Sequence, residues 1–121
     1  MKNCLIVGAG GFLGAAARYL ITLLPVPEHT AFPVKTLGIN LLGCFVIGLV
    51  SAAAERHGLA PQLTLFLRVG LCGGFTTFSS FALETLGLAG RGSTASALLY
   101  VLLSVVLGVC FVWLGERIPL R

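Results

Sequence analysis

The stretch GLCGGFTTFSSF, residues 70–81, holds the residue types in this chain that are best suited to ion chemistry. It combines a pair of adjacent glycines with two pairs of hydroxyl residues: Gly73, Gly74, Thr76, Thr77, Ser79 and Ser80. Glycine disfavours a helix interior and hydroxyl side chains compete for backbone hydrogen bonds, so an uninterrupted helix is not expected here. A broken helix frees carbonyl groups that attract a cation and N–H groups that attract an anion. The stretch therefore predicts an ion site at a helix break.

Three phenylalanines are interleaved with these hydroxyl groups, at Phe75, Phe78 and Phe81. At helical spacing their rings share one side, and the edge of a phenyl ring carries partial positive charge. Ring edges and hydroxyl donors can together replace part of the water shell of an anion without a fixed charge. Asn40, the one strongly polar side chain of its apolar segment, can add an amide donor. Ordinary packing of the rings and an interhelical hydrogen bond from Asn40 are the alternative interpretations.

A second glycine-rich stretch, LIVGAGGFLGAAARYL at residues 5–20, is similar to the phosphate-binding turn of dinucleotide folds. That turn requires an acidic residue about 20 positions later, after a second strand. The chain has no Asp, and the Glu at that distance, Glu28, lies between prolines that do not suit a central strand. Gly10 and Gly14 instead form a GxxxG pair, the pattern of closely packed membrane helices. Nucleotide binding is therefore not expected.

The remaining reactive side chains do not suggest a catalytic or zinc site. The four cysteines form no CxxC pair and lie in apolar segments, which favours a packing role: Cys4, Cys44, Cys72 and Cys110. No nucleophile, base and orienting group can be combined from these residues, so we do not expect an enzyme.

The composition is that of a membrane protein. Hydrophobic residues make up 57% of the chain and charged residues 10%, whereas a soluble domain carries about 25% charged residues. Four apolar segments are each long enough for one crossing: 4–24, 37–54, 63–86 and 94–115. The sequence predicts an all-α membrane protein, a single membrane domain over residues 1–121 with four transmembrane helices. The third helix is expected to be broken near the midplane of the bilayer, and no nucleic-acid partner is expected.

The positive charges give little preference for one orientation in the membrane. Four crossings place both termini on one side, and the eight Lys and Arg residues divide five to three between the sides. One side has Lys2, Arg56, Arg68, Arg117 and Arg121, and the other has Arg18, Lys35 and Arg91. Because Lys and Arg asymmetry sets orientation, so small a bias is compatible with insertion both ways.

The sequence resembles the Fluc/CrcB-type fluoride channels along its whole length. GGFLGAAARY, TLGINLLGCFVIG and GLCGGFTTFSSF are similar to the motifs of the first, second and third helices of that family, and the third is the most specific. The resemblance implies an antiparallel, dual-topology homodimer, multi-pass in the cell (inner) membrane. It would export fluoride passively through two pores, giving resistance to fluoride toxicity. A structural sodium ion would lie at the dimer interface.

The resemblance also assigns roles to individual residues. Phe78 and Phe81 would be the pore phenylalanines and Asn40 the pore amide, while the backbone carbonyls of Gly73 and Thr76 would bind sodium. Further polar groups along the fluoride pore would come from Thr77, Ser79, Ser80, Tyr100 and Ser104. Glu84, one turn beyond Phe81, would help fluoride to leave. Arg18 would draw anions toward a vestibule or reach along its own helix to the membrane surface.

Two other classes of protein remain open at this point. A small proton-coupled multidrug exporter also has four helices, but it needs a carboxylate embedded in the membrane, and the first helix here has none. Glu84 is the only candidate, and it lies toward a helix end. A structural membrane subunit is the other alternative, and such a subunit would not need the glycine, hydroxyl and aromatic pattern of residues 70–81.

Overall fold

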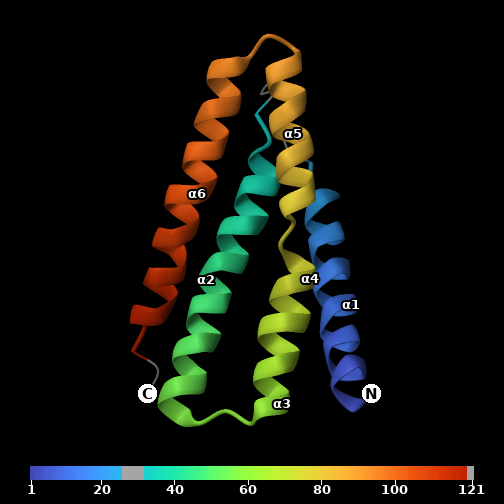
Figure 1. Cartoon of the computed structure of the whole chain (residues 1–121), viewed down its shortest axis with the longest axis vertical. Helices are drawn as coiled ribbons and strands as arrows, with labels where there is room; N and C mark the ends of the chain where they lie inside the picture. The colour runs from blue at the N-terminus through green and yellow to red at the C-terminus, as the bar shows by residue number, and fades with distance from the viewer. Residues whose placement is uncertain (26–31, 120–121) are drawn as a thin grey trace.

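The computed structural model describes residues 1–25 and 32–119, so Glu28 and Arg121 lie outside the described residues. The described chain is helical (Figure 1). Its elements are α1 (Lys2–Thr22), α2 (Val34–His57), α3 (Pro61–Thr64), η1 (Leu65–Cys72), α4 (Gly73–Phe75), α5 (Phe78–Gly90) and α6 (Thr94–Arg117).

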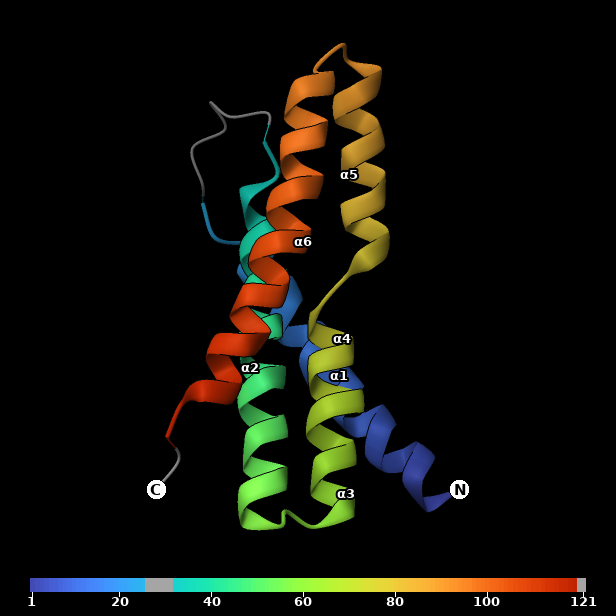
Figure 2. The same ribbon diagram turned by 60° about the vertical axis from the view of Figure 1, so that its left-hand side comes forward.

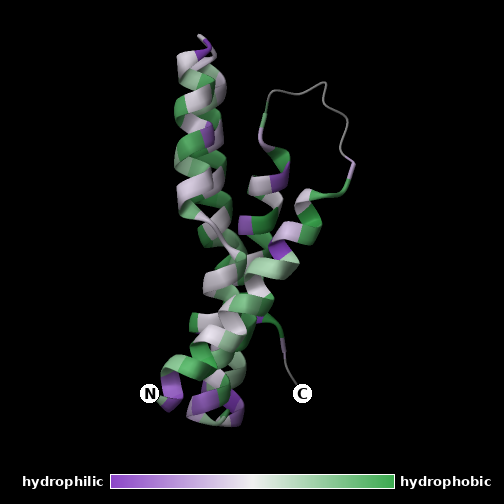
Figure 3. Ribbon diagram, turned by 90° about the vertical axis from the view of Figure 1, so that its right-hand side faces the viewer, coloured by the Kyte–Doolittle hydropathy of each residue, from purple (hydrophilic) through white to green (hydrophobic). Residues whose placement is uncertain are grey.

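Four stretches of helix are long and apolar enough to cross a membrane: Lys2–Thr22, Val34–His57, Pro61–Gly90 and Thr94–Arg117. Their mean hydropathy lies between 1.2 and 2.6. Figure 3 shows apolar colours along much of the helical length, with hydrophilic colours at both ends and at a few positions between them. The protein is therefore an all-helical membrane protein, as the composition predicts.

The chain runs up and down the long axis of the molecule. α3, η1, α4 and α5 follow one another along almost the whole axis, and α6 returns from the far end (Figure 1). The N-terminus and the C-terminal end of α6 lie toward the end that carries the connection between α2 and α3 (Figure 1). α2 is capped at its C-terminus by Gly58, which has a left-handed φ of 61°. Arg56 and His57 lie in the last turn, where positive charge interacts favourably with the helix dipole.

Glycines bring α1 into backbone contact with the first half of the third span. A Cβ built on Gly14 would overlap the carbonyl oxygen of Leu71. On the facing helix, a Cβ built on Gly74 would overlap the carbonyl oxygen of Gly11. Gly10 and Gly14 are both buried. The interpretation of the first glycine-rich stretch as a packing surface is therefore confirmed.

α2 and α6 are held together in the same way. A Cβ on Gly48 would overlap the carbonyl oxygen of Val112, and one on Gly115 would overlap that of Phe45. A small apolar core lies near the N-terminal end of α6, where Leu88 of α5 is buried together with Ala97 and Tyr100 of α6. Phe32, Leu37 and Phe81 pack against that core.

The third span is interrupted at Thr76 and Thr77, which confirms the predicted break. Thr76 has φ −78° and ψ 157°, and Thr77 has φ −146° and ψ 107°, so both are extended. Figure 2 shows the resulting straight link between α4 and α5. The glycine pair itself is not at the break, because Gly73 and Gly74 form the last helical turn before it. Gly73 has helical angles, φ −64° and ψ −37°.

Candidate ion site at the broken helix

Hydroxyl groups cap the two helix ends that meet at the break. The Thr76 hydroxyl donates to the carbonyl of Cys72 at 3.0 Å. The Thr77 hydroxyl accepts from the backbone N–H of Ser80 at 3.2 Å and donates to the Ser80 hydroxyl at 2.9 Å. Thr77 is thus the N-cap of α5, a position that Thr favours because its oxygen satisfies a free N–H of the first turn. The predicted pore hydroxyls of Thr77 and Ser80 are therefore also structural.

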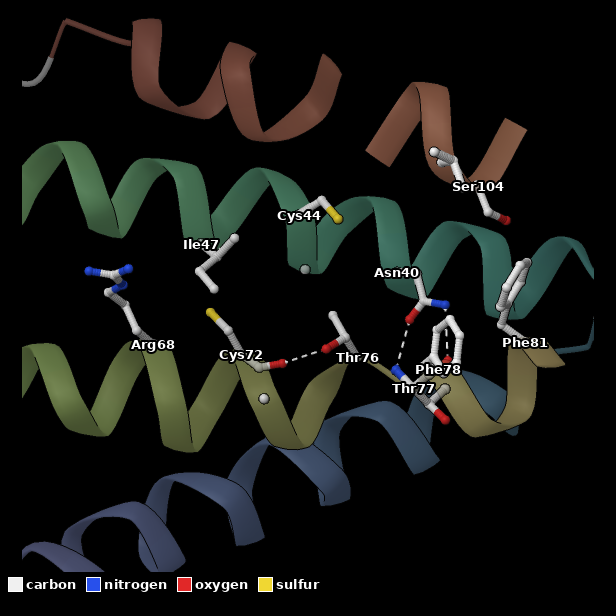
Figure 4. Close-up of a pocket in the computed structure, with 13 residues that line it drawn as sticks. Asn40, Cys44, Ile47, Arg68, Cys72, Thr76, Thr77, Phe78, Phe81 and Ser104 are labelled. Carbon is white, nitrogen blue, oxygen red and sulfur yellow. Dashed lines mark hydrogen bonds between the residues drawn. The ribbon is translucent and has the colours of Figure 1, made fainter. Parts of the chain in front are cut away.

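The amide of Asn40 on α2 holds the extended link in place. Its oxygen accepts from the Thr77 N–H at 2.8 Å, and its nitrogen donates to the Thr77 carbonyl at 3.2 Å (Figure 4). Both backbone groups of Thr77 are thereby satisfied by one side chain. The amide nitrogen carries two hydrogens, and this contact uses one of them.

The carbonyl end of α4 is only partly satisfied. The last four carbonyls of a helix have no partner within it. The Nε of Arg18 on α1 donates to the Gly74 carbonyl at 3.3 Å. Among the described residues, no hydrogen-bond donor contacts the carbonyls of Gly73, Phe75 or Thr76. The sequence suggested a vestibule role or a membrane-surface role for Arg18, and neither of these included a contact with the break.

The aromatic side chains form a series that starts after the break. The ring centroids of Phe78 and Phe81 are 5.6 Å apart, and those of Phe81 and Tyr100 are 5.1 Å apart. The series continues from Tyr100 to Phe32 at 5.4 Å, edge to face. Phe75 lies in α4, on the other side of the break. The expected ladder of three phenylalanines at helical spacing is therefore wrong, because the helix does not continue from 75 to 78.

Glu84 accepts two hydroxyl hydrogen bonds. Thr36 donates to Oε1 at 2.6 Å and Tyr100 donates to Oε2 at 2.8 Å. Tyr100 is fully buried, and Thr36 is nearly so. Sequence reasoning gave Thr36 no role. The sequence signal that could have identified Thr36 is its spacing from Asn40, because it precedes Asn40 by four residues and so lies on the same face of α2.

A cavity of about 340 Å³, the break cavity, lies between α2, α6 and the broken helix (Figure 4). Seven predicted site residues line it: Asn40, Gly73, Thr76, Thr77, Phe78, Phe81 and Ser104. The other lining residues are Gly43, Cys44, Ile47, Arg68, Cys72 and Val105. The Ser104 hydroxyl oxygen is buried and has no hydrogen-bond partner among the described residues. The cavity therefore holds a buried donor that lacks an acceptor.

The other predicted residues lie apart from this cavity. Glu84 lines a second cavity of about 360 Å³ with Arg91 and Pro33, toward the connection of α5 and α6. Ser79 is exposed, with its hydroxyl 3.5 Å from that of Thr77. Five of the predicted residues are thus outside the lining of the break cavity: Arg18, Ser79, Ser80, Glu84 and Tyr100.

A family model described as CrcB-like protein, Camphor Resistance (CrcB), matches residues 5–116. The chain belongs to this family. Its relatives include proteins named "Fluoride-specific ion channel FluC". The relative from Prosthecochloris aestuarii is 47% identical over 92% of this chain and 88% of its own length. Those from Chlorobaculum tepidum and Paracoccus denitrificans are each 47% identical over 95% of this chain, and over 92% and 93% of their own lengths. The family resemblance of the three helix motifs is therefore confirmed.

In this CrcB-family chain, replacing Asn40 should destabilise the extended link between α4 and α5 more than any other element. Asn40→Ala leaves the N–H and carbonyl of Thr77 unpaired, at a cost of about 1–3 kcal/mol for each group that stays buried. We expect a lower thermal midpoint in detergent and faster hydrogen exchange at the Thr77 amide.

Ser51→Ala is the matched control, because Ser51 also lies on α2 but bonds only within its own helix, to the Ile47 carbonyl at 2.8 Å. Equal midpoints for the two variants, with unchanged exchange at Thr77, would show that Asn40 does not hold the break.

Proposed function

We propose that this chain is a fluoride-specific ion channel of the cell membrane, which lets fluoride leave the cytoplasm passively and so gives resistance to fluoride. The observation that carries the proposal is the buried, unpartnered Ser104 hydroxyl in a cavity next to Phe78 and Phe81. The FluC names of relatives that match nearly the whole chain support it. An ion channel has no catalytic step, in agreement with the expectation that the chain is not an enzyme.

The chemistry of the break cavity suits a small, strongly hydrated anion. A buried anion must recover hydrogen bonds in place of its lost water, or the transfer costs several kcal/mol. Ser104 can donate one hydrogen bond, and the second N–H of Asn40 can donate another. The edges of Phe78 and Phe81 add positive potential between these donors. Such weak, distributed contacts allow an ion to bind without being trapped, which conduction requires.

The second cavity supports a role for Glu84 beyond the phenylalanines. The Glu84 carboxylate accepts hydrogen bonds from the hydroxyl groups of Thr36 and Tyr100. The ring of Tyr100 is in contact with that of Phe81. The single hydrogens of both hydroxyl groups are donated to Glu84, so a fluoride ion that passes Phe81 next meets the negative charge of this carboxylate, which favours its release. We assign Tyr100 and Glu84 to the exit of the path on this ground, with Ser79 and Ser80 beside it.

We propose further that the chain inserts into the membrane in both orientations and that two oppositely oriented copies pair as an antiparallel dimer. Large apolar side chains are exposed on the single chain, and Phe78, beside the break, is 79% exposed. A second copy that covers this face would complete the surroundings of the ring. The small difference in Lys and Arg between the two ends supports insertion both ways.

Orientation can be measured with single cysteines at opposite ends of the molecule, in a background without the native ones. Gly90→Cys suits one end, because a Cβ there meets nothing within 4 Å, and the exposed Glu116 suits the other. We expect each site to be labelled by an impermeant thiol reagent from both sides of the membrane. Labelling of each site from one side only would contradict dual topology.

A structural sodium ion at the dimer interface fits the groups that the break leaves free. The Gly73 and Thr76 carbonyls have no hydrogen-bond donor among the described residues, and oxygen atoms are the ligands that hard cations prefer. Gly73 is exposed on the single chain and lines the break cavity, so a second copy can approach it. The ion would supply positive charge that joins the free carbonyls of two chains.

Removal of sodium should then weaken the dimer. A cation that binds only the folded dimer stabilises it by about 2.7 kcal/mol at one hundred times its dissociation constant. We expect a lower thermal midpoint and a smaller crosslinked dimer fraction when N-methylglucamine replaces sodium. Titration with sodium should restore both, and identical values in the two buffers would count against the site.

Fluoride efflux from liposomes tests the function itself. Purified protein should release trapped fluoride down its own gradient, with no imposed pH gradient and little release of chloride, as followed with ion-selective electrodes. Phe78→Ile and Phe81→Ile should each lower the fluoride flux by at least about tenfold, the effect of a barrier raised by ~1.4 kcal/mol. Both substitutions keep an apolar side chain but remove the aromatic edge.

Phe75→Ile is the matched control, because Phe75 precedes the break and stands outside the ring series that Phe78 and Phe81 share with Tyr100. Equal and mild effects at all three positions, with dimers intact, would mean that the rings only pack. Efflux that depends on an imposed pH gradient would favour a proton-coupled exporter.

A further inference from the structure

Arg68 is a cation inside an apolar span with no described partner. It lies on η1, the π-helical stretch Leu65–Cys72, eight residues before the break. Among the described residues it has no hydrogen bond, ion pair or ring contact. A charged side chain within a membrane span is costly, and where it occurs it generally faces a partner or a water-filled space that serves transport. The cost of placing the Arg68 charge within an apolar span therefore calls for a functional explanation.

Three other arginines show how this chain uses Arg structurally. Arg18 donates to the Gly74 carbonyl, and Arg56 donates to the carbonyls of Glu116 and Ile118 at 2.8 Å. The Arg117 guanidinium lies 4.9 Å from the ring centroid of Trp113. Each of these side chains ties one element to another or packs on its own helix, and Arg68 does neither.

Two cavities meet at Arg68. It lines the break cavity, and it also lines a cavity of about 440 Å³ beside α3, here called the α3 cavity. Ile47 is the other residue common to both linings. The α3 cavity is completed by Pro61, Thr64, Leu65 and Val69. α3 lies at the same end of the molecule as the N-terminus (Figure 1), so the α3 cavity lies on that side of the break cavity.

Arg68 lines the break cavity on its α3 side, where the linings of the two cavities share residues. In Figure 4 Arg68 rises from η1 toward α2, at the opposite end of the break cavity from Phe81 and Ser104. Eight residues of helix separate it from Thr76, roughly 10–12 Å along the axis. None of the described residues that line the two cavities is acidic. An anion that arrives from the α3 end thus meets one unopposed positive charge before it reaches the uncharged donors.

We propose that Arg68 is the anion-capture residue of the fluoride path, which concentrates fluoride at the mouth of the break cavity on the α3 side. This inference rests on the proposed channel function and adds to it a site and a direction of approach. Arg68 acts by charge on an ion in transit, so its effect falls on capture at low fluoride and not on passage past Phe78 and Phe81. The attraction is screened by salt over about 10 Å at 0.1 M ionic strength.

The test is the initial fluoride flux of liposomes as a function of fluoride concentration, for wild type, Arg68→Gln and Arg68→Lys. Arg68→Gln should raise the half-saturating fluoride concentration by about threefold or more, the effect of losing one unit charge several ångströms from the ion in water. The maximal flux should change much less. Arg68→Lys keeps the charge and should restore the concentration dependence. Arg117→Gln, the same change at an exposed site outside both cavities, should leave it unchanged.

A second readout is ionic strength, raised with an impermeant salt at constant sodium. The flux of wild type at low fluoride should fall as salt screens Arg68, and that of Arg68→Gln should fall less. A flux that falls equally at every fluoride concentration in Arg68→Gln would overturn capture and indicate an anchoring role toward lipid headgroups. A wild-type concentration and salt dependence in Arg68→Gln would also overturn it. A wild-type protein that passes no fluoride would instead remove the channel function on which the inference rests.

Discussion

The contact between the Asn40 amide and the backbone of Thr77 is the interaction on which the rest of the site depends. A helix broken within a membrane leaves backbone groups that water cannot satisfy, and each must find a partner in the protein. Asn40 satisfies both groups of Thr77 from α2, and Arg18 takes the Gly74 carbonyl from α1. The break is thereby fixed from two sides. What remains unsatisfied, the carbonyls near it and the Ser104 hydroxyl, is then available for ions.

Close helix packing makes these contacts possible. Arg18 can reach Gly74 because glycines on α1 and on the first half of the third span let the two backbones touch. Gly43 plays a similar part on α2, because a Cβ there would overlap the Thr76 side chain. The glycine contacts between α2 and α6 hold Ser104 over the same cavity that Asn40 lines. Small residues are therefore as important to the site as its polar residues, since they set the distances across which short polar side chains must reach.

The charges along the proposed fluoride path are arranged unevenly. Arg68, on the α3 side, has no hydrogen bond or ion pair among the described residues. The middle offers uncharged donors and ring edges, and Glu84 lies beyond the phenylalanines with two hydroxyl partners. In the proposed path, the positive charge of Arg68 favours capture, and the negative charge of Glu84 favours release. Arg68 is the one charged residue among the described lining residues of the break cavity, and it lies at the opposite end from Phe81, so no fixed charge holds an anion beside the rings too tightly.

The sequence by itself determined the membrane class, the four helical spans, the existence of the break and the small-residue packing of the first helix. These follow from hydropathy, from segment length and from local backbone preferences, which act over a few residues. Only the tertiary structure decided where the break falls, because Gly74 serves the contact with α1 and the chain leaves the helix at Thr76 and Thr77. Likewise, the pairing of Thr36 and Tyr100 with Glu84, and the place of Arg68 between two cavities, join residues from separate helices. No pattern along one segment specifies which face of another helix it will meet, so these contacts required the packed fold.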